Sequence, residues 1–210
     1  MMKFPRGRRL DVSGWCFKIQ NYCRVIFNIR VLVHLVRLKL YIRGVDFGKH
    51  IRFNGFPIVH RVPDSKIKIG DNCMFNSSRH SQPIGIYRPC AFVTLNKGAE
   101  IIIGNNSGAT GVSIVASRSV TIGNNVIIGA FCTLIDNDFH NPDPNKRNTI
   151  IAKPIVIEDN VFLGFNCFVL KGVTIGKNSV IGANSVVISN IPPNSFAMGN
   201  PCKIIVERDW

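Results

Sequence analysis

The sequence predicts an all-β chain, a parallel β-helix of six-residue repeats that follows an N-terminal basic amphipathic helix. Two patterns predict the β-helix: an aliphatic residue recurs at every sixth position of residues 157–187, and a small or β-branched residue recurs four positions after it. A third observation predicts the helix, because residues 15–43 contain neither glycine nor proline and are rich in basic and aliphatic side chains.

A period of six fits neither the 3.6-residue turn of an α-helix nor the alternation of a strand, so the chain must bend once per repeat. Three repeats then close a triangular coil, and successive coils stack at about 4.8 Å. We expect two sets of side chains to fill the interior. The aliphatic set is Ile157, Leu163, Val169, Ile175, Ile181 and Val187, and the small set is Val161, Cys167, Val173, Ser179 and Ser185.

The predicted helix spans residues 13–43. Residues 1–43 carry ten Lys or Arg against one acid, which gives a net charge of +9. One face carries polar side chains at spacings of three and four, namely Arg30, His34, Arg37 and Tyr41, and the rest is apolar. Such a helix suits an anionic membrane surface, and packing on the β-helix or on a neighbouring subunit is the alternative. Nucleic acid is not expected as a partner, because no aromatic platform or basic groove motif accompanies the charges.

The first repeats are faint, at Phe47 and Ile69, and residues 77–98 then interrupt them without a six-residue frame. This interruption contains polar side chains that an acceptor pocket could use: Arg79, His80, Tyr87, Arg88 and Asn96. We expect Tyr87, Arg88 and Asn96 to bind the substrate. A loop that only covers the early coils is the alternative.

The frame returns at Ile103, Ala109 and Val115, slips by one residue to Ile122, and continues through Ile128 and Leu134. The next position in the frame is His140. Residues 141–150 are turn formers and charges that cannot continue the prism, so we expect a loop to project there, with His140 at its root.

The segment around His140 is the strongest sign of chemistry outside the repeats. Asp136 and Asp138 alternate with His140 along an extended segment, so their side chains can share a face, and one carboxylate can orient the imidazole. An oriented imidazole with a pKa near neutrality suits a general base that takes a proton from a hydroxyl. The three residues are therefore the candidate catalytic group.

Residues 99–206, with their Asp-x-Asp-x-His segment followed by VFLGFN, GVTIG, SVIGANSVV and GNPCK, resemble the hexapeptide-repeat sugar O-acetyltransferases. These include galactoside, maltose and Nod-factor acetyltransferases, and the resemblance is closer to those of capsule, exopolysaccharide and O-antigen biosynthesis. It implies a left-handed β-helix, a homotrimer and acetyl-CoA bound between two subunits. The implied coenzyme-binding residues are Gly164, Phe165, Ala183 and Lys203, with an N–H near Gly164 and Phe165 for the oxyanion.

We therefore divide the chain into a basic helical segment at 1–43, an acyltransferase β-helix at 44–199 with a loop at 141–150, and a C-terminal tail at 200–210. Transfer to an amino sugar or to serine remains an alternative to transfer to a sugar hydroxyl. A scaffold without activity would leave the Asp-x-Asp-x-His segment unexplained. A metalloenzyme of the carbonic anhydrase kind needs clustered histidines, and only one of the five lies in a strong repeat, so no metal is expected.

The sequence also predicts a location. No secretory signal is recognisable, seven cysteines occur without a Cys-x-x-Cys pair, and charges interrupt every apolar run that could cross a bilayer. We expect a cytoplasmic protein that contacts the inner face of the membrane. Cys73, Cys132 and Cys167 fall at inward corners of the repeats and are expected to be buried thiols.

Overall fold

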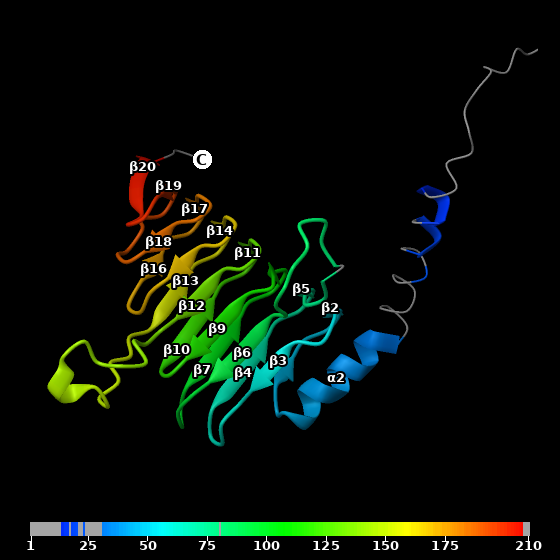
Figure 1. Cartoon of the computed structure of the whole chain (residues 1–210), viewed down its shortest axis with the longest axis horizontal. Coiled ribbons are helices and arrows are strands. Elements are labelled where there is room, and N and C mark those ends of the chain that lie inside the picture. The colour runs from blue at the N-terminus through cyan, green and yellow to red at the C-terminus, as the bar shows by residue number, and fades with distance from the viewer. Residues whose placement is uncertain (1–13, 17, 21–22, 24–30, 80, 208–210) are drawn as a thin grey trace, which may run out of the picture.

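The computed structural model describes residues 14–16, 18–20, 23, 31–79 and 81–207, and it confirms the parallel β-helix (Figure 1). Within the predicted N-terminal helix, residues 14–16 and 18–20 are helical, and the continuous helix is α2 (Val33–Ile42). The predicted roles of Arg30 and His80 lie outside the described residues.

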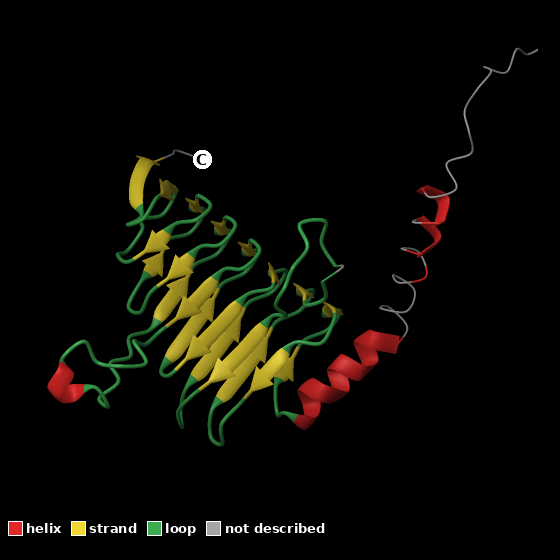
Figure 2. Ribbon diagram, in the orientation of Figure 1, coloured by secondary structure: helices red, strands yellow, loops and turns green. Residues whose placement is uncertain are grey.

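Each coil contributes one strand to each of three parallel sheets, which form the sides of the prism in Figure 2. The first sheet contains β1 (Asp46–Phe47), β4 (Lys66–Ile69), β7 (Glu100–Ile103), β10 (Ser119–Ile122), β13 (Ile155–Ile157) and β16 (Thr174–Ile175). The second contains β2 (Arg52–Asn54), β5 (Met74–Asn76), β8 (Gly108–Thr110), β11 (Ile127–Ile128), β14 (Phe162–Leu163), β17 (Val180–Ile181), β19 (Ser195–Met198) and β20 (Lys203–Glu207). The third contains β3 (Ile58–His60), β6 (Ala91–Thr94), β9 (Ser113–Ala116), β12 (Thr133–Ile135), β15 (Phe168–Val169) and β18 (Val186–Val187).

The interior of the prism is filled as the repeats predict. All six aliphatic residues from Ile157 to Val187 are fully buried, and so are the five small residues between them. They stack in register, because Ile157 pairs with Ile175 and Leu163 pairs with Ile181. The first coils are filled instead by Phe53, Phe75 and Phe92, whose rings pack in sequence at centroid distances of 5.1 Å.

One inward position of the predicted frame is wrong. Leu134 pairs with Ile114, which is fully buried, whereas Val115 pairs with Ile135 and is only half-buried. The spacing is five residues from Ala109 to Ile114 and eight from Ile114 to Ile122, so the frame slips on both sides of Ile114. The local alternation of the strand, with inward Ile114 and Ala116 on either side of Val115, decides which side chains are buried.

The two ends of the prism are covered by different elements. At the N-terminal end α2 lies against β1 and β2, and Val36 and Leu40 of α2 are buried in the core together with Leu32, which directly precedes the helix. At the other end β20 pairs antiparallel with β19, so the predicted C-terminal tail contains a strand. None of the described helices is long and apolar enough to cross a membrane.

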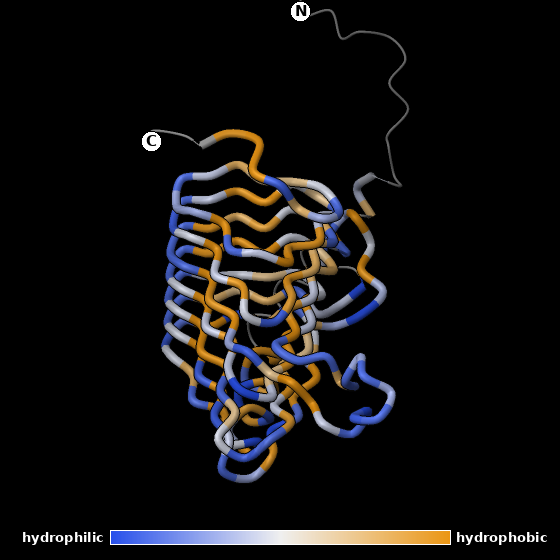
Figure 3. Tube along the Cα trace, turned by 90° about the vertical axis from the view of Figure 1, so that its left-hand side faces the viewer, coloured by the Kyte–Doolittle hydropathy of each residue, from blue (hydrophilic) through white to orange (hydrophobic). Residues whose placement is uncertain are grey.

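The three edges of the prism have different compositions. The edge from the first sheet to the second, here called the asparagine corner, carries a column of residues with left-handed backbone: Asn72, Asn106, Asn125, Asn160, Asn178 and Asn194. Each donates its side-chain amide to the next, from 2.8 to 3.2 Å. Figure 3 shows hydrophilic turns stacked in a column along one side of the prism.

Two excursions leave the coils. Residues 77–90 leave between β5 and β6, at the edge from the second sheet to the third. Residues 136–154 leave between β12 and β13, at the edge from the third sheet to the first, and include the short helix η2 (Pro144–Lys146). Figure 1 shows the two excursions projecting from different sides of the prism. The second excursion contains the predicted loop 141–150 and begins five residues before it.

Candidate active site

His140 lies on the second excursion, and its side chain is exposed. The backbone on both sides of it is fixed. On one side the Asn137 side chain accepts a hydrogen bond from the Phe139 N–H at 2.8 Å, and on the other the buried Asn141 bonds to Thr149 and Arg147 across the loop. The imidazole forms no hydrogen bond or ion pair with any residue that the structure describes, so both nitrogens are open to a ligand.

Asp136, one of the two aspartates predicted to orient this imidazole, has its carboxylate bonded elsewhere in the structure. Its side chain is fully buried, and its two carboxylate oxygens accept hydrogen bonds from the backbone N–H groups of Ser117 and Arg118, at 2.7 and 2.6 Å. The Asp136 carbonyl also accepts from the Lys153 N–H, which closes the base of the excursion. Asp136 is therefore an anchor of the loop.

Asp138 is paired with a lysine that sequence reasoning did not identify. Its carboxylate forms an ion pair with Lys171, on the next coil, and both side chains are about one quarter exposed. Both residues are described by the structure, and the hydrogen bond that joins Asp138 to His140 is a backbone one, from the His140 N–H to the Asp138 carbonyl at 2.6 Å. Strand register alone would not have identified the pair of Asp138 with Lys171, because Leu134 pairs with Val169 and the residue that corresponds to Lys171 two positions further on is therefore Asp136, not Asp138.

The edge from the second sheet to the third, here called the aromatic corner, brings together Tyr87, Phe131 and Phe165. Tyr87 stacks on Phe131 at a centroid distance of 4.3 Å and an angle of 20°, and Phe131 meets Phe165 edge to face at 5.5 Å. Phe131 is buried with Ile86 and Ala130 in a small apolar cluster separate from the prism core. Tyr87 is 69% exposed, so one face of its ring is covered and the other is open.

Arg88 holds this arrangement in place. Its guanidinium donates to the carbonyls of Gly111, Phe131 and Cys132 and to the Thr133 hydroxyl. These bonds use Nε and Nη2 and fasten the first excursion to the neighbouring coils, whereas Nη1 donates to no described residue. Asn96 lies away from this group, at the edge from the third sheet to the first, where its amide donates to the Ser117 carbonyl at 3.2 Å.

The predicted coenzyme residues lie along the aromatic corner and the end of the prism. Gly164 is buried at the stacking contact between coils, where a Cβ would lie 2.7 Å from the Ala183 nitrogen. Ala183 and Lys203 are exposed. The Gly164 N–H donates to the Ile181 carbonyl at 2.8 Å, whereas the Phe165 N–H donates to no described residue. Of the two predicted oxyanion donors, only Phe165 is available.

Two phenylalanines have strained backbones, one at the aromatic corner and one beside His140. Of twelve described non-glycine residues with positive φ, ten are Asn, Asp or His, which tolerate this conformation. The other two are Phe131 (φ 65°) at the aromatic corner and Phe139 (φ 57°) beside His140. Bulky side chains rarely adopt this conformation, and such strain concentrates at functional sites.

Cys132 is buried beneath the aromatic corner and is unsuited to nucleophilic attack. A hydrogen bond with the Cys167 thiol and burial both raise the pKa of Cys132, so its thiol stays protonated at neutral pH. Cys73 and Cys167 are also buried, as predicted. Within the described ranges no three His, Cys, Asp or Glu side chains gather as a metal-binding group.

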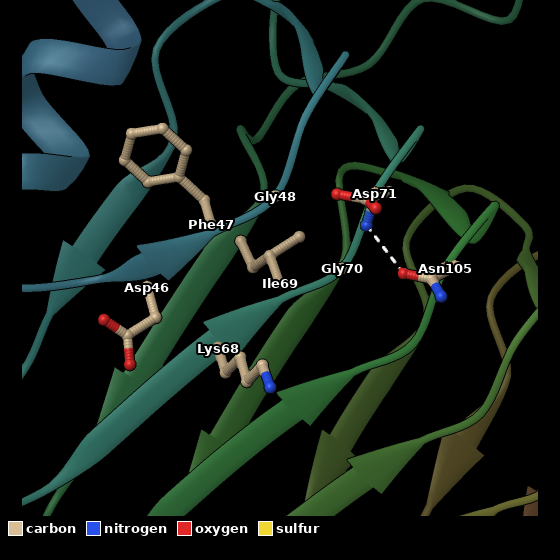
Figure 4. Close-up of a pocket in the computed structure, with 8 residues that line it drawn as sticks. All are labelled: Asp46, Phe47, Gly48, Lys68, Ile69, Gly70, Asp71 and Asn105. Carbon is tan, nitrogen blue, oxygen red and sulfur yellow. Dashed lines mark hydrogen bonds between the residues drawn. The ribbon is translucent and has the colours of Figure 1, made fainter.

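A pocket of about 290 Å³ lies elsewhere, on the first coils (Figure 4). Its lining includes Asp46, Lys68, Asp71 and Asn105, and the Asp71 N–H donates to the Asn105 side chain at 2.8 Å. It contains none of the predicted catalytic or coenzyme residues, and its Asp71 and Asn105 take part in the hydrogen bonds that join coils.

Comparison with known proteins shows what the chain is similar to. The family described as "Hexapeptide repeat of succinyl-transferase" matches residues 154–189. A hexapeptide-repeat-containing acetyltransferase from Vibrio cholerae has the same fold, with a TM-score of 0.58 and 26% sequence identity over 90% of this chain and 89% of that one. Over residues 154–189 the chain therefore carries hexapeptide repeats of this family. Its fold is the left-handed parallel β-helix, as the resemblance implied.

Two further similar proteins are acetyltransferases. Galactoside O-acetyltransferase from Escherichia coli (strain K12) is 42% identical over 118 residues, which cover 55% of this chain and 58% of that relative. A galactoside acetyltransferase in complex with coenzyme A is 25% identical, with a TM-score of 0.57 over 90% of this chain and 78% of that one. The chain spans less than two thirds of the length of the E. coli relative.

Proposed function

We propose that the chain transfers an acetyl group from acetyl-CoA to a hydroxyl group of a sugar. The observation that supports this most directly is the setting of His140: an exposed imidazole, free of described partners, on a loop whose backbone is fixed on both sides. The similarity to galactoside O-acetyltransferases and to an acetyltransferase with bound coenzyme A supports the donor and the acceptor class.

In the proposed reaction His140 takes the proton of the sugar hydroxyl as that oxygen attacks the thioester carbonyl. The Phe165 N–H stabilises the negative charge that develops on the carbonyl oxygen. When the carbon–sulfur bond breaks, the coenzyme leaves as a thiol that has received the proton from the imidazolium. The product is the acetyl ester of the sugar. No acetylated cysteine is required, because a thioester is already activated.

The carboxylate that would stabilise the imidazolium is proposed to be Asp138, because the Asp136 carboxylate is already bonded to two backbone N–H groups. Asp138 is partly exposed and paired with Lys171, so it would have to exchange partners or act through its position next to the loop. Lys203 is proposed to meet a phosphate of the coenzyme, since it is exposed at the end of the prism.

The proposed site needs two chains. His140 projects from one edge of the prism, whereas Phe165 lies at another, with the whole third sheet between the two edges. We propose that the loop of one subunit meets the aromatic corner of its neighbour in a homotrimer. A C3 assembly would produce three equivalent sites.

The test is release of coenzyme A thiol from acetyl-CoA in the presence of a panel of sugars, with identification of the ester by mass spectrometry. His140→Ala should lower turnover by about 10² to 10⁴ at saturating acetyl-CoA, the usual worth of a general base, while coenzyme binding persists. Cys132→Ala should keep most turnover. Full activity of the histidine variant, or an acetylated cysteine trapped in the wild type, would contradict this mechanism.

We also propose a place for the reaction, in surface polysaccharide synthesis at the inner face of the membrane. The basic N-terminal segment supports this location, as does α2, which carries apolar side chains on the side opposite its buried face. Deletion of the gene should remove O-acetyl groups from surface polysaccharide. Unchanged acetyl content would contradict this role and leave the transferase activity untouched.

A further inference from the structure

The open face of Tyr87 is a binding surface whose occupant the proposed site does not yet specify. The ring is 69% exposed, although aromatic rings of this size usually cover most of their surface. Its inner face is stacked on Phe131, so the ring has no freedom to fold back on the protein. A flat, rigid, half-covered ring suits a flat apolar ligand surface.

The ring is held rigidly from two directions. Next to it in the chain, Arg88 donates to three carbonyls and one hydroxyl on neighbouring coils. Beneath it, Phe131 is buried and has a left-handed backbone. One of the hydrogen bonds from Arg88 is to the Phe131 carbonyl, so Arg88 directly holds the residue on which Tyr87 stacks. Rigid pre-positioning of this kind reduces the entropic cost of binding.

The order of residues along the aromatic corner indicates what the ring faces. Lys203 and Ala183 lie at the C-terminal coils, Phe165 is one coil closer to the N-terminus, Phe131 is one further, and Tyr87 stacks on Phe131. If coenzyme phosphate is at Lys203 and the thioester carbonyl is at Phe165, then Tyr87 lies beyond the reacting carbon. That position belongs to the acceptor.

We infer that Tyr87 stacks against the C–H face of a pyranose ring and so selects a cyclic sugar over an open-chain hydroxyl compound or serine. The inference rests on the proposed acetyl transfer and adds its acceptor class. A pyranose presents its axial and ring C–H groups as an apolar face, which an aromatic ring can cover, while its hydroxyls remain at the rim. The Tyr87 hydroxyl is placed to bond to one of these hydroxyls.

The test compares acceptors and variants in the full chain. Methyl β-D-galactopyranoside and galactitol offer similar hydroxyls, but only the first has a rigid ring face. Wild-type protein should have a kcat/KM at least about 10-fold higher for the galactoside, and Tyr87→Ala should raise the KM for the galactoside by about 10-fold, the scale of one aromatic contact. Tyr87→Phe should retain most of the ring effect. The KM for acetyl-CoA should stay unchanged.

A matched control is Tyr41→Ala, which removes an equally exposed tyrosine from α2 and should leave the acceptor KM at the wild-type value. Three outcomes would overturn the inference: an unchanged acceptor KM in Tyr87→Ala, a raised KM for acetyl-CoA, which would put the coenzyme on the ring, or a changed molar mass by light scattering, which would make the ring a subunit contact. Absence of transfer by the wild type to any sugar would instead contradict the proposed function.

Discussion

The candidate site has two parts, the loop that carries His140 and the aromatic corner. The sequence could assign a role to some of their residues but not to others. His140 stands out in the sequence because it replaces an aliphatic residue in a regular frame. The roles of the two aspartates could not be assigned in this way, because alternation places both on one face but does not tell which carboxylate meets backbone N–H groups. The structure separates them, with Asp136 buried against Ser117 and Arg118 and Asp138 paired with Lys171.

Removal of the Asp136 carboxylate should destabilise the fold. Asp136→Ala removes the acceptor of two backbone N–H groups, that of the buried Ser117 and that of Arg118, and we expect the free energy of unfolding to fall by about 3 kcal/mol. The measurement is urea denaturation followed by circular dichroism. Asp143→Ala is the control, because that carboxylate is partly exposed on the loop, and its loss should cost under about 1 kcal/mol. Equal losses in the two variants would contradict the anchoring role.

At the scale of elements, the asparagine corner joins one coil to the next. Asn125 has a left-handed backbone, accepts a hydrogen bond from Asn106 and donates to Asn160. Asn125→Ala should lower the free energy of unfolding by about 2 kcal/mol, since alanine disfavours this backbone conformation and the side-chain bonds are lost. Asn125→Gly separates the two causes, because glycine adopts the conformation freely. If both variants lose equal stability, backbone conformation contributes nothing.

The helix α2 has two apolar sides. Leu32, Val36 and Leu40 are buried on the prism, while Leu35 and Leu38 are about half exposed and Ile42 is more exposed still. Sequence periodicity predicted a polar face opposite an apolar one; it could not show that part of the apolar face would remain uncovered. The buried side of α2 packs on the β-helix, which was the alternative prediction for this helix. The exposed side is the part that could contact a membrane, and that contact stays a prediction.

The exposed side of α2 should contribute to membrane attachment. Replacing Leu35 and Leu38 by glutamine keeps every charge and should lower the fraction that floats with phosphatidylserine-containing vesicles by about 10-fold, because buried apolar area and basic residues both contribute to surface binding. Ile188→Gln removes a similarly exposed aliphatic side chain outside α2 and should float like the wild type. Equal flotation of the double variant and the wild type would contradict lipid contact.

At the scale of the whole molecule, the outer surface of the second sheet carries an apolar row. Met74, Ile127 and Phe162 are 40%, 59% and 43% exposed, and strand pairing places them in one column. An exposed row of this kind on a flat sheet favours association with another subunit. We expect Ile127→Asp to convert a trimer into a monomer in light scattering at micromolar concentration. Ile42→Asp, on α2, should remain trimeric, and a monomeric wild type would contradict the assembly.

The fold could be predicted almost entirely from the sequence because each coil repeats the same packing problem. The six aliphatic residues of 157–187 and the small residues between them are all buried, and only Val115 was placed on the wrong side. The irregular segments could not be predicted in the same way. Arg88 forms hydrogen bonds with Phe131 and Thr133, which are more than 40 positions away, and such bonds produce no repeating pattern in the sequence.

The two covers at the ends of the prism also limit how chains can meet. A stack of parallel strands leaves unpaired N–H and C=O groups on its first and last coils, and a second stack could continue it as a filament. Here α2 blocks one terminal coil, and β20 runs opposite to the strand direction on the other. These covers discourage end-to-end polymerisation, and they leave the sides of the prism free for the proposed homotrimer, in which a loop from one chain would reach the edge of the next.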